Sequence, residues 1–459
     1  MKKLFTFIIL TYLRLAARLQ LAKIHPKIVG LTGSVGKTSL RNAVAAVLAT
    51  KYRVKKSIKA NSETGIPLDI LGLHPRDYSF GDWLRLILLI PVKLLFDWQR
   101  YDIYVVELGV DEPLPPKNME YLLRFIKPDI GVFLNVAPVH TQQFAKLIHP
   151  NELFSSINQR EDFLLKAIAQ EKGRLVTKLE KDKVAIVNRD DPYVWSVAQR
   201  TKAKLVAFGQ SVTDPNQVKI TGVDHFVTGK KIIHPNEVTT KFTFVYQTKT
   251  QVVQLSLLVP DYYASTLAAA ISVGLNLGIS FTEAGKALVQ NFKLPPGRMN
   301  LFAGINNSLL IDSSYNASRL ATIGALELLA KVPAKPKVIV LGDMRELGEI
   351  AGQEHELVAQ EILKVADEVI LVGPLTKKYV FPIISSKLPT HWFVNSWQAA
   401  DYLKLHLENG SAVLIKGSQN TIFTETIVEK LLKNQADVKK LCRRGEFWEK
   451  QRQQLAIAK

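Results

Sequence analysis

The stretch Lys27-Ile-Val-Gly30-Leu-Thr-Gly33-Ser-Val-Gly36-Lys37-Thr38-Ser39 decides the fold expected for this chain. It places a short apolar run, Ile28–Thr32, before a glycine-rich turn, and the pattern from Ser39 to Leu48 predicts a helix after it. A strand, a glycine-rich turn and a helix in this order form a phosphate-binding loop, in which backbone N–H groups and the helix amino terminus meet phosphate oxygens. Leu31 stands where the common pattern has its first glycine, so the spacing is a variant.

The residues of this loop have distinct expected roles. Lys37 would neutralise the β- and γ-phosphates of a nucleotide, and the Thr38 hydroxyl would bind Mg²⁺. The remaining nucleotide contacts in the loop are expected from Gly33, Ser34, Gly36 and Ser39.

Apolar runs of strand length alternate with helical patterns in both parts of the chain. They are 104–108, 130–134 and 184–187 in the first part, and 309–311, 338–341, 369–372 and 412–415 in the last. Between them, 242–246 and 252–257 predict antiparallel strands joined by a turn at Thr248, and 264–277 predicts a helix. The expected fold class is α/β: a P-loop central domain with a parallel sheet and a small antiparallel sheet, followed by a Rossmann-like α/β carboxy-terminal domain.

The chain length and a segment rich in proline and glycine predict the domain boundaries. A chain of 459 residues is too long for one core, and Lys293-Leu-Pro-Pro-Gly-Arg298 marks a boundary. We expect a basic amphipathic helix at 1–25 and a central ATP-binding domain at 26–295, with an insertion at about 74–100. A carboxy-terminal domain at 296–459 would end in a basic helical tail, 438–454.

Composition narrows the partners and the compartment. The net charge of +19 favours anionic partners such as nucleotides, phosphorylated substrates or acidic lipids, whereas no helix-turn-helix, zinc-finger or RNA-binding signature points to nucleic acid. The single cysteine, Cys442, excludes a disulfide within the chain and a cysteine metal cage. We expect a monomer in the cytoplasm.

Two apolar stretches with basic residues leave alternatives open. Leu4–Leu13 is followed by Arg14 and Arg18, which favours a basic amphipathic helix over a signal peptide, and the run is too short to span a bilayer. Such a helix lies on the inner face of the membrane or packs on the protein. The stretch Trp83–Trp98 is either a membrane-facing insertion or a buried helix.

Further motifs follow the loop along nearly the whole chain. They are Asn61-Ser-Glu-Thr-Gly65-Ile-Pro67-Leu68, Glu107-Leu-Gly109, Asn135-Val-Ala-Pro138-Val-His140, Pro296-Gly297-Arg298, Asp312-Ser-Ser-Tyr315-Asn316-Ala317, Leu341-Gly-Asp-Met344-Arg-Glu-Leu347-Gly348-Glu349 with His355, and Lys416-Gly417-Ser418. In type and order these motifs resemble the Mur ligase family, closest to its branch that adds D-alanyl-D-alanine to a peptidoglycan precursor.

The resemblance implies an ATP-dependent amide ligase. It would form an acyl phosphate on a precursor peptide and join it to a D-alanyl-D-alanine-like amine. Glu107 would bind Mg²⁺ together with Thr38, and His140 would hold a second Mg²⁺. Lys172, in Glu171-Lys-Gly-Arg174, matches a family lysine that is carbamylated and orients the metal.

The resemblance also assigns residues outside the loop. Arg298 would reach the γ-phosphate when the last domain closes about Pro296 and Gly297. Asn188 and Asp312 are expected at the nucleotide. Lys416 would belong to the closed site.

Three departures from the family pattern keep other functions open. Only 29 residues precede Gly30, where that branch carries a uridine-nucleotide domain, so we expect a lipid-linked or otherwise unusual acceptor. Pro260-Asp-Tyr-Tyr263 replaces Gly-x-His-Asn, and Ser313 replaces an aspartate. The alternatives are a ligase with a folylpolyglutamate- or cyanophycin-type acceptor, and a membrane-associated nucleotide-binding protein with weakened catalysis.

Overall fold

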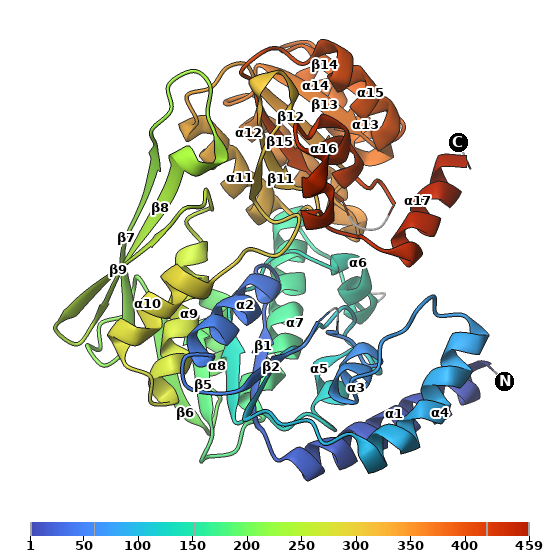
Figure 1. Ribbon diagram of the computed structural model, residues 1–459, viewed down its shortest axis with the longest axis vertical. Coiled ribbons are helices and arrows are strands. Elements are labelled where there is room, and N and C mark those ends of the chain that lie inside the picture. The colour runs from blue at the N-terminus through green and yellow to red at the C-terminus, as the bar shows by residue number, and fades with distance from the viewer. Residues whose placement is uncertain (1, 59, 150–151, 419–420, 458–459) are drawn as a thin grey trace. The chain divides into compact units, whose positions relative to one another are not determined.

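Nine strands form the first sheet, in the order β2-β3-β1-β4-β5-β6-β7-β8-β9 (Figure 1). The computed structural model describes residues 2–58, 60–149, 152–418 and 421–457. Neighbouring strands from β2 to β7 run parallel. The strands are β1 Lys27–Thr32, β2 Val54–Lys56, β3 Ile103–Glu107, β4 Ile130–Phe133, β5 Val184–Asn188, β6 Lys204–Gly209, β7 Val218–Val227, β8 Val238–Tyr246 and β9 Lys249–Leu255.

The chain forms two units, each described here by itself. The first is Met1–Thr221 with Thr243–Val253 and Ala264–Lys293, and the second is Gly222–Phe242 with Gln254–Tyr263 and Leu294–Lys459. The helices of the first unit are α1 Lys2–Ile24, α2 Lys37–Leu48, α3 Gly65–Ile70, α4 Phe80–Phe96, α5 Met119–Leu122, α6 Thr141–Phe144, η1 Ala145–Leu147, α7 Ile157–Thr177, α8 Pro192–Ala198, α9 Tyr263–Asn276, whose first residue belongs to the second unit, and α10 Phe281–Asn291.

The central parallel strands of the first unit, β3 and β4, are largely apolar and have helices on both sides. Every residue of β3 and β4 is buried, as expected for strands with helices on both sides. The helices begin at conventional caps: Ser156 accepts a hydrogen bond from the Gln159 N–H at the start of α7, and Asp191 caps α8 ahead of Pro192.

Six strands form the sheet of the second unit, in the order β10-β11-β15-β12-β13-β14. They pair in parallel except for β10 and β11, which are antiparallel. The elements are β10 Asn300–Ala303, η3 Ile305–Asn307, β11 Leu309–Ser313, α11 Arg319–Lys331, β12 Lys337–Gly342, η4 Gly348–Ile350, α12 Ala351–Ile362, β13 Glu368–Val372, α13 Pro374–Tyr379, α14 Phe381–Ile384, β14 Thr390–Phe393, α15 Ser396–His406, β15 Ala412–Lys416, α16 Glu425–Leu431, η5 Gln435–Lys440 and α17 Glu446–Ile457, with η2 Pro235–Glu237 between β7 and β8.

The expected α/β class is confirmed, including the parallel first sheet, the connection of β8 to β9 through Gln247 and Thr248, and a second parallel α/β sheet. The continuous helical tail expected at 438–454 is wrong. The chain there forms η5, then a break at Arg443 and Gly445, both with positive φ, and then α17. Arg443 is buried in an ion pair with Glu425, which holds the break in place.

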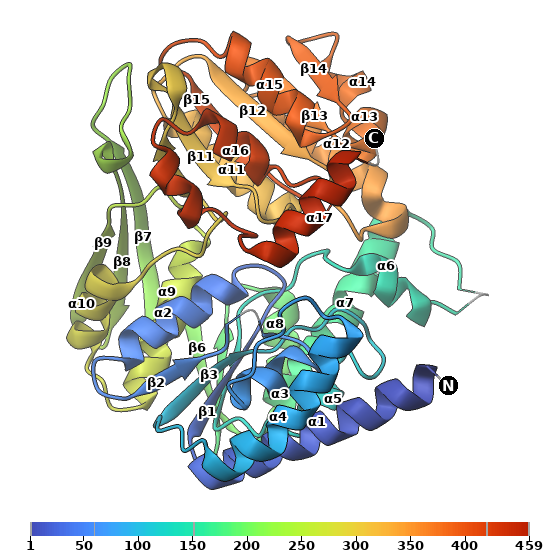
Figure 2. The same cartoon turned by 45° about the vertical axis from the view of Figure 1, so that its right-hand side comes forward.

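The two apolar stretches noted in the sequence are the helices α1 and α4, which lie side by side (Figure 2). Each helix has a buried face and an exposed face, so neither is wholly buried. Met1 lies outside the described residues. Within the described part of the chain, no helix combines the length and the hydropathy that crossing a bilayer requires.

Candidate active site at the phosphate-binding loop

The carboxyl ends of four parallel strands bring the first group of candidate residues to one edge of the sheet. The register pairs Leu31 with Glu107 across β1 and β3, and Thr32 with Phe133 across β1 and β4. Phe133 pairs in turn with Val187 of β5. The loop after β1, the Glu107 carboxylate, the segment after β4 and Asn188 therefore share the edge at which α/β folds bind their ligands.

The loop is fixed by an asparagine from the segment that follows β4. The side-chain oxygen of Asn135 accepts hydrogen bonds from the Ser34 N–H at 3.0 Å and the Val35 N–H at 2.9 Å, and its amide donates to the Val35 carbonyl at 3.0 Å. Gly36 caps α2 with φ +86°, and a Cβ there would lie 3.1 Å from Leu134. This backbone shape depends on glycine, and it leaves the amino terminus of α2 as a phosphate cradle.

Thr38 and Glu107 meet within this edge. The Thr38 hydroxyl donates to Oε2 of Glu107 at 3.0 Å, and the Arg41 guanidinium lies 3.9 Å from the same oxygen. The Ser57 hydroxyl accepts a hydrogen bond from the Glu107 N–H and fixes the strand end. A hydroxyl and a carboxylate so close are oxygen donors of the kind that Mg²⁺ shares with nucleotide phosphates.

Lys37 and Lys172 form a second pair of groups at the site. The Lys37 ammonium donates to the carbonyls of Gly33 at 2.8 Å and Ser34 at 3.2 Å, within its own loop. Lys172 is 1% exposed on α7 and donates to the Val110 carbonyl at 3.0 Å. Burial, and then the charge of Lys37, lower the pKa of Lys172 to about 7. A lysine in this state carries a neutral amine for much of the time near neutral pH.

The segment around Lys172 is fixed by close packing. A Cβ on Gly173 would lie 2.3 Å from Val197, so α7 approaches α8 through a glycine. Glu171 accepts a hydrogen bond from the Met119 N–H at 2.9 Å. These contacts hold the lysine side chain toward Val110, beside the end of β3.

His140 lies at the amino end of α6 with φ +56°. Its Nε2 is 3.4 Å from Oδ1 of Asp111, a residue that the sequence analysis did not single out. Asp111 follows the Glu-Leu-Gly motif, and that proximity is the only signal for it in the sequence. No group of three or more His, Cys, Asp and Glu side chains placed to hold a metal ion occurs among the described residues.

The remaining predicted residues of the first unit, Ser39 and Asn188, lie in the first turn of α2 and at the end of β5. Ser39 is fully buried in the first turn of α2. The Asn188 side chain accepts a hydrogen bond from the Asp190 N–H at 3.0 Å and shapes the turn after β5.

Arg298, Asp312 and Lys416 come together within the second unit. The Arg298 guanidinium lies 4.6 Å from the centre of the Tyr315 ring. Register places Ser313 beside Lys416, and the Lys416 ammonium donates to the Asn316 carbonyl. Burial, and then the Arg298 charge, lower the pKa of Lys416 to about 7, against the opposing effect of Asp312.

Asp312 is fully buried and only half satisfied. Its Oδ1 accepts a hydrogen bond from the Ser314 N–H at 3.0 Å, while Oδ2 has no hydrogen-bond partner in the described part of the chain. Burial raises the pKa of this carboxyl group. This group therefore combines a buried acid, one oxygen of which has no hydrogen-bond partner in the described part of the chain, with a buried amine bound to the Asn316 carbonyl.

A loop of this shape, with a lysine in it and a hydroxyl–carboxylate pair beside it, is what phosphoryl transfer from a nucleotide requires. The fold and the site together define a P-loop enzyme.

Two family models match the chain. The Mur ligase middle domain matches residues 31–149 and 164–273, and the Mur ligase, glutamate ligase domain matches residues 297–419. The chain belongs to the Mur ligase family and is an ATP-dependent ligase.

Individual relatives agree with this assignment. The chain is 26% identical over 408 residues to the UDP-N-acetylmuramoyl-tripeptide–D-alanyl-D-alanine ligase of Synechocystis, covering 88% of this chain and 74% of that protein. It is 27% identical over 417 residues to the Escherichia coli protein of the same name, covering 88% and 77%. The crystal structure of MurF ligase from Thermotoga maritima in complex with ADP shares the fold, with a TM-score of 0.71, 23% identity and coverage of 97% of this chain and 84% of that one.

Proposed function

We propose that this chain joins the carboxylate of a peptidoglycan precursor peptide to the amine of D-alanyl-D-alanine, at the expense of ATP. The observation that carries the proposal is the Thr38–Glu107 contact beside the phosphate loop, in a chain whose curated relatives are named for this reaction. The precursor peptide is attached either to a lipid or to UDP, and the acceptor panel described below distinguishes the two.

The reaction proceeds in two transfers. A carboxylate oxygen of the acceptor attacks the γ-phosphorus of ATP, ADP leaves, and an acyl phosphate forms. The amine of D-alanyl-D-alanine then attacks the acyl carbon, loses a proton, and expels inorganic phosphate that retains one oxygen of the original carboxylate. Catalysis of the first transfer is mainly positioning and charge neutralisation, for which Lys37 is placed in the loop.

Mg²⁺ belongs to this proposal. Thr38 and Glu107 would hold it through oxygen atoms, with His140 and a carbamylated Lys172 at a second position. The metal would neutralise charge on the transferred phosphoryl group. A lysine amine must be neutral to react with CO₂, and the lowered pKa of Lys172 supports that assignment.

Within the nucleotide site, Gly33, Ser34, Gly36, Ser39 and Asn188 would contact the nucleotide. Arg298 would meet the γ-phosphate through its guanidinium fork, with Asp312 and Lys416 as its neighbours. We also propose that the enzyme is a monomer that contacts the inner face of the cytoplasmic membrane peripherally.

The test is phosphate release with a panel of acceptors. UDP-linked and lipid-linked muramyl peptides are each supplied with ATP, Mg²⁺ and D-alanyl-D-alanine, and a folyl-glutamate acceptor is supplied with ATP, Mg²⁺ and L-glutamate. Release that requires both a muramyl peptide and D-alanyl-D-alanine is expected. Release with the folyl acceptor alone would favour the alternative family branch, and nucleotide binding without any release would favour a protein with lost catalysis.

A further inference from the structure

The helices α1 and α4 expose apolar side chains that the core does not use. The exposed side chains recur at about one-turn spacing on α4 and at one- or two-turn spacing on α1, as on an amphipathic surface helix. They are Phe7, Ile8, Leu15 and Leu19 on α1 and Phe80, Leu84, Leu88, Val92, Leu95 and Phe96 on α4. We call this set the α1/α4 apolar surface. Large apolar side chains gathered in this way are unusual on a free surface and indicate an interaction site.

The opposite faces of the two helices fix them to the protein and to each other. Leu13 and Ala16 of α1 share a core cluster with Leu86 and Ile90 of α4. Ser79 caps α4, and Asp82 binds Arg85 at 2.6 Å in its first turns. The exposed leucines therefore stand on rigid elements, because both helices are held by packing on their inner faces.

Charge around the apolar surface is positive. Helix α1 contains no acidic residue, and Arg18 is exposed beside Leu19. The one acid within α4, Asp82, is buried and paired with Arg85. An apolar face bordered by cations suits an anionic bilayer, in which acyl chains meet the leucines and headgroups meet the cations.

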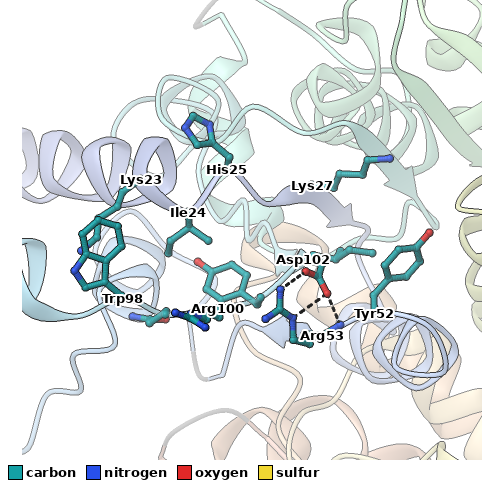
Figure 3. A pocket seen from close by; sticks show the side chains of 12 residues that line it. Lys23, Ile24, His25, Lys27, Tyr52, Arg53, Trp98, Arg100 and Asp102 are labelled. Carbon is teal, nitrogen blue, oxygen red and sulfur yellow. Dashed lines mark hydrogen bonds and ion pairs between the residues drawn. The ribbon is translucent and has the colours of Figure 1, made fainter.

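A basic pocket lies where the two helices end (Figure 3). Its volume is about 520 Å³, and Lys23 of α1 and the exposed Trp98 after α4 both line it. The other lining residues that are basic or acidic are His25, Lys27, Arg53, Arg100 and Asp102. The one acid among them, Asp102, is bound by Arg53 at 2.6 Å. The Lys23 ammonium lies 4.0 Å from the centre of the Trp98 ring. The pocket therefore combines a tryptophan with several cations, as is common where proteins contact lipid headgroups.

We propose that the α1/α4 apolar surface docks on an anionic bilayer, with the basic pocket at its end taking a lipid phosphate. This inference rests on the proposed function in one respect: the proposed function includes peripheral membrane contact, and the inference names the protein surface and the lipid that make the contact. The membrane contact itself requires no ligase chemistry.

Vesicle flotation of the full chain tests this directly. Phosphatidylcholine vesicles are compared with vesicles that also contain phosphatidylglycerol. We expect co-flotation with the anionic vesicles, weakened about ten-fold or more when Leu15, Leu19, Leu88 and Leu95 are all changed to Ser. The substitutions Lys27→Gln and Arg100→Gln together should weaken binding to the anionic vesicles and have little effect on the neutral ones.

Matched controls separate docking from general stickiness and from misfolding. Leu405→Ser removes a leucine that is 80% exposed on α15, and Lys178→Gln removes an exposed lysine, so both should leave flotation unchanged. The quadruple variant should keep the wild-type midpoint of thermal unfolding and the wild-type rate of phosphate release on a soluble acceptor.

Failure of the wild-type chain to float with anionic vesicles would overturn the proposal. So would a dimer in analytical ultracentrifugation that the quadruple variant dissociates, because the surface would then serve a second copy. If the wild-type chain floats with anionic vesicles but shows no ligase activity, the proposed function is contradicted and the membrane proposal is not.

Discussion

The hydroxyl of Thr38 lies 3.0 Å from a carboxylate oxygen of Glu107, although the two residues are far apart in the sequence. The contact arises because β1 and β3 are parallel neighbours whose register pairs Leu31 with Glu107. Thr38 in turn opens α2 directly after the loop that follows β1. Two oxygen donors at this spacing define where a divalent cation would meet the nucleotide.

The first prediction concerns this pair. Glu107→Gln keeps the shape of the side chain and removes its charge, so it should raise the Mg²⁺ concentration needed for half-maximal activity and lower kcat by about 100-fold. Phosphate release measured over a Mg²⁺ series checks it. Asp102→Asn changes a carboxylate just before the same strand, in an exposed pair with Arg53, and serves as the control that should leave the Mg²⁺ dependence unaltered.

Lys37 is the loop cation, and its removal should be the most severe change in the chain. Lys37→Ala is expected to lower kcat by about 1000-fold or more, because the migrating phosphoryl charge loses its nearest compensating group. Lys178→Ala, at an exposed lysine after α7, should retain wild-type activity. Single-turnover formation of ADP is the measurement, and near-normal turnover of Lys37→Ala would refute the site.

Lys172 makes activity sensitive to pH and to CO₂. Its pKa is lowered from 10.5 to about 7, so the neutral amine is populated above pH 7 and is lost as the pH falls through that value. Because only the neutral amine forms a carbamate, activity should fall below pH 7, by roughly ten-fold per unit, and added bicarbonate should raise it.

A spectroscopic readout separates this role from a purely structural one. A ¹³C NMR carbamate signal should form on the wild-type protein in ¹³C-bicarbonate and be absent from Lys172→Arg, while Lys178→Arg keeps it. A wild type with neither the signal nor any response to bicarbonate would exclude carbamylation.

A buried arginine near the carboxyl end of the chain should control stability. Arg443 binds Glu425 at 2.9 Å with almost no exposure of either side chain, and it also donates to the carbonyls of Ser314 and Ser418. Arg443→Met removes the nearer of two cations at the buried Glu425 carboxylate and leaves only Arg452 at 3.8 Å, so the free energy of unfolding should fall by about 3 kcal/mol.

The double variant Arg443→Met with Glu425→Leu removes both charges and should be less destabilised than Arg443→Met alone. Urea unfolding of the set gives the comparison. A double variant that loses the sum of the two single losses would show that the ion pair is not coupled.

Sequence patterns predicted the fold well where local signals were strong. The predicted run 104–108 corresponds to β3, Ile103–Glu107, every residue of which is buried because both faces of the strand are covered. Short edge strands such as β2 and β14 were not predicted, since three or four residues carry too little pattern. The tail expected at 438–454 failed because a long-range pair with Glu425 fixes Arg443, which periodicity along the chain does not reveal.

The site was predictable in its residue types and unpredictable in its electrostatics. The phosphate-loop pattern singled out Lys37 and Thr38, and the family motifs singled out Glu107, whose carboxylate accepts a hydrogen bond from the Thr38 hydroxyl. The role of Glu107 as a metal ligand stays a prediction. The lowered pKa of Lys172 results from its burial and from the charge of Lys37, and neither can be read from the local sequence. Asn135 and Asp111 gained their roles from strand order, which brings the end of β4 and the segment after β3 against the loop.

The most direct test of the central claim follows an oxygen atom. An acceptor peptide carrying ¹⁸O at both oxygens of its reactive carboxylate is incubated with ATP, Mg²⁺, D-alanyl-D-alanine and the enzyme, and the released phosphate is analysed by mass spectrometry. Passage through an acyl phosphate predicts that one ¹⁸O atom appears in each phosphate released. Phosphate that carries no ¹⁸O, formed while the amide product accumulates, would contradict the account.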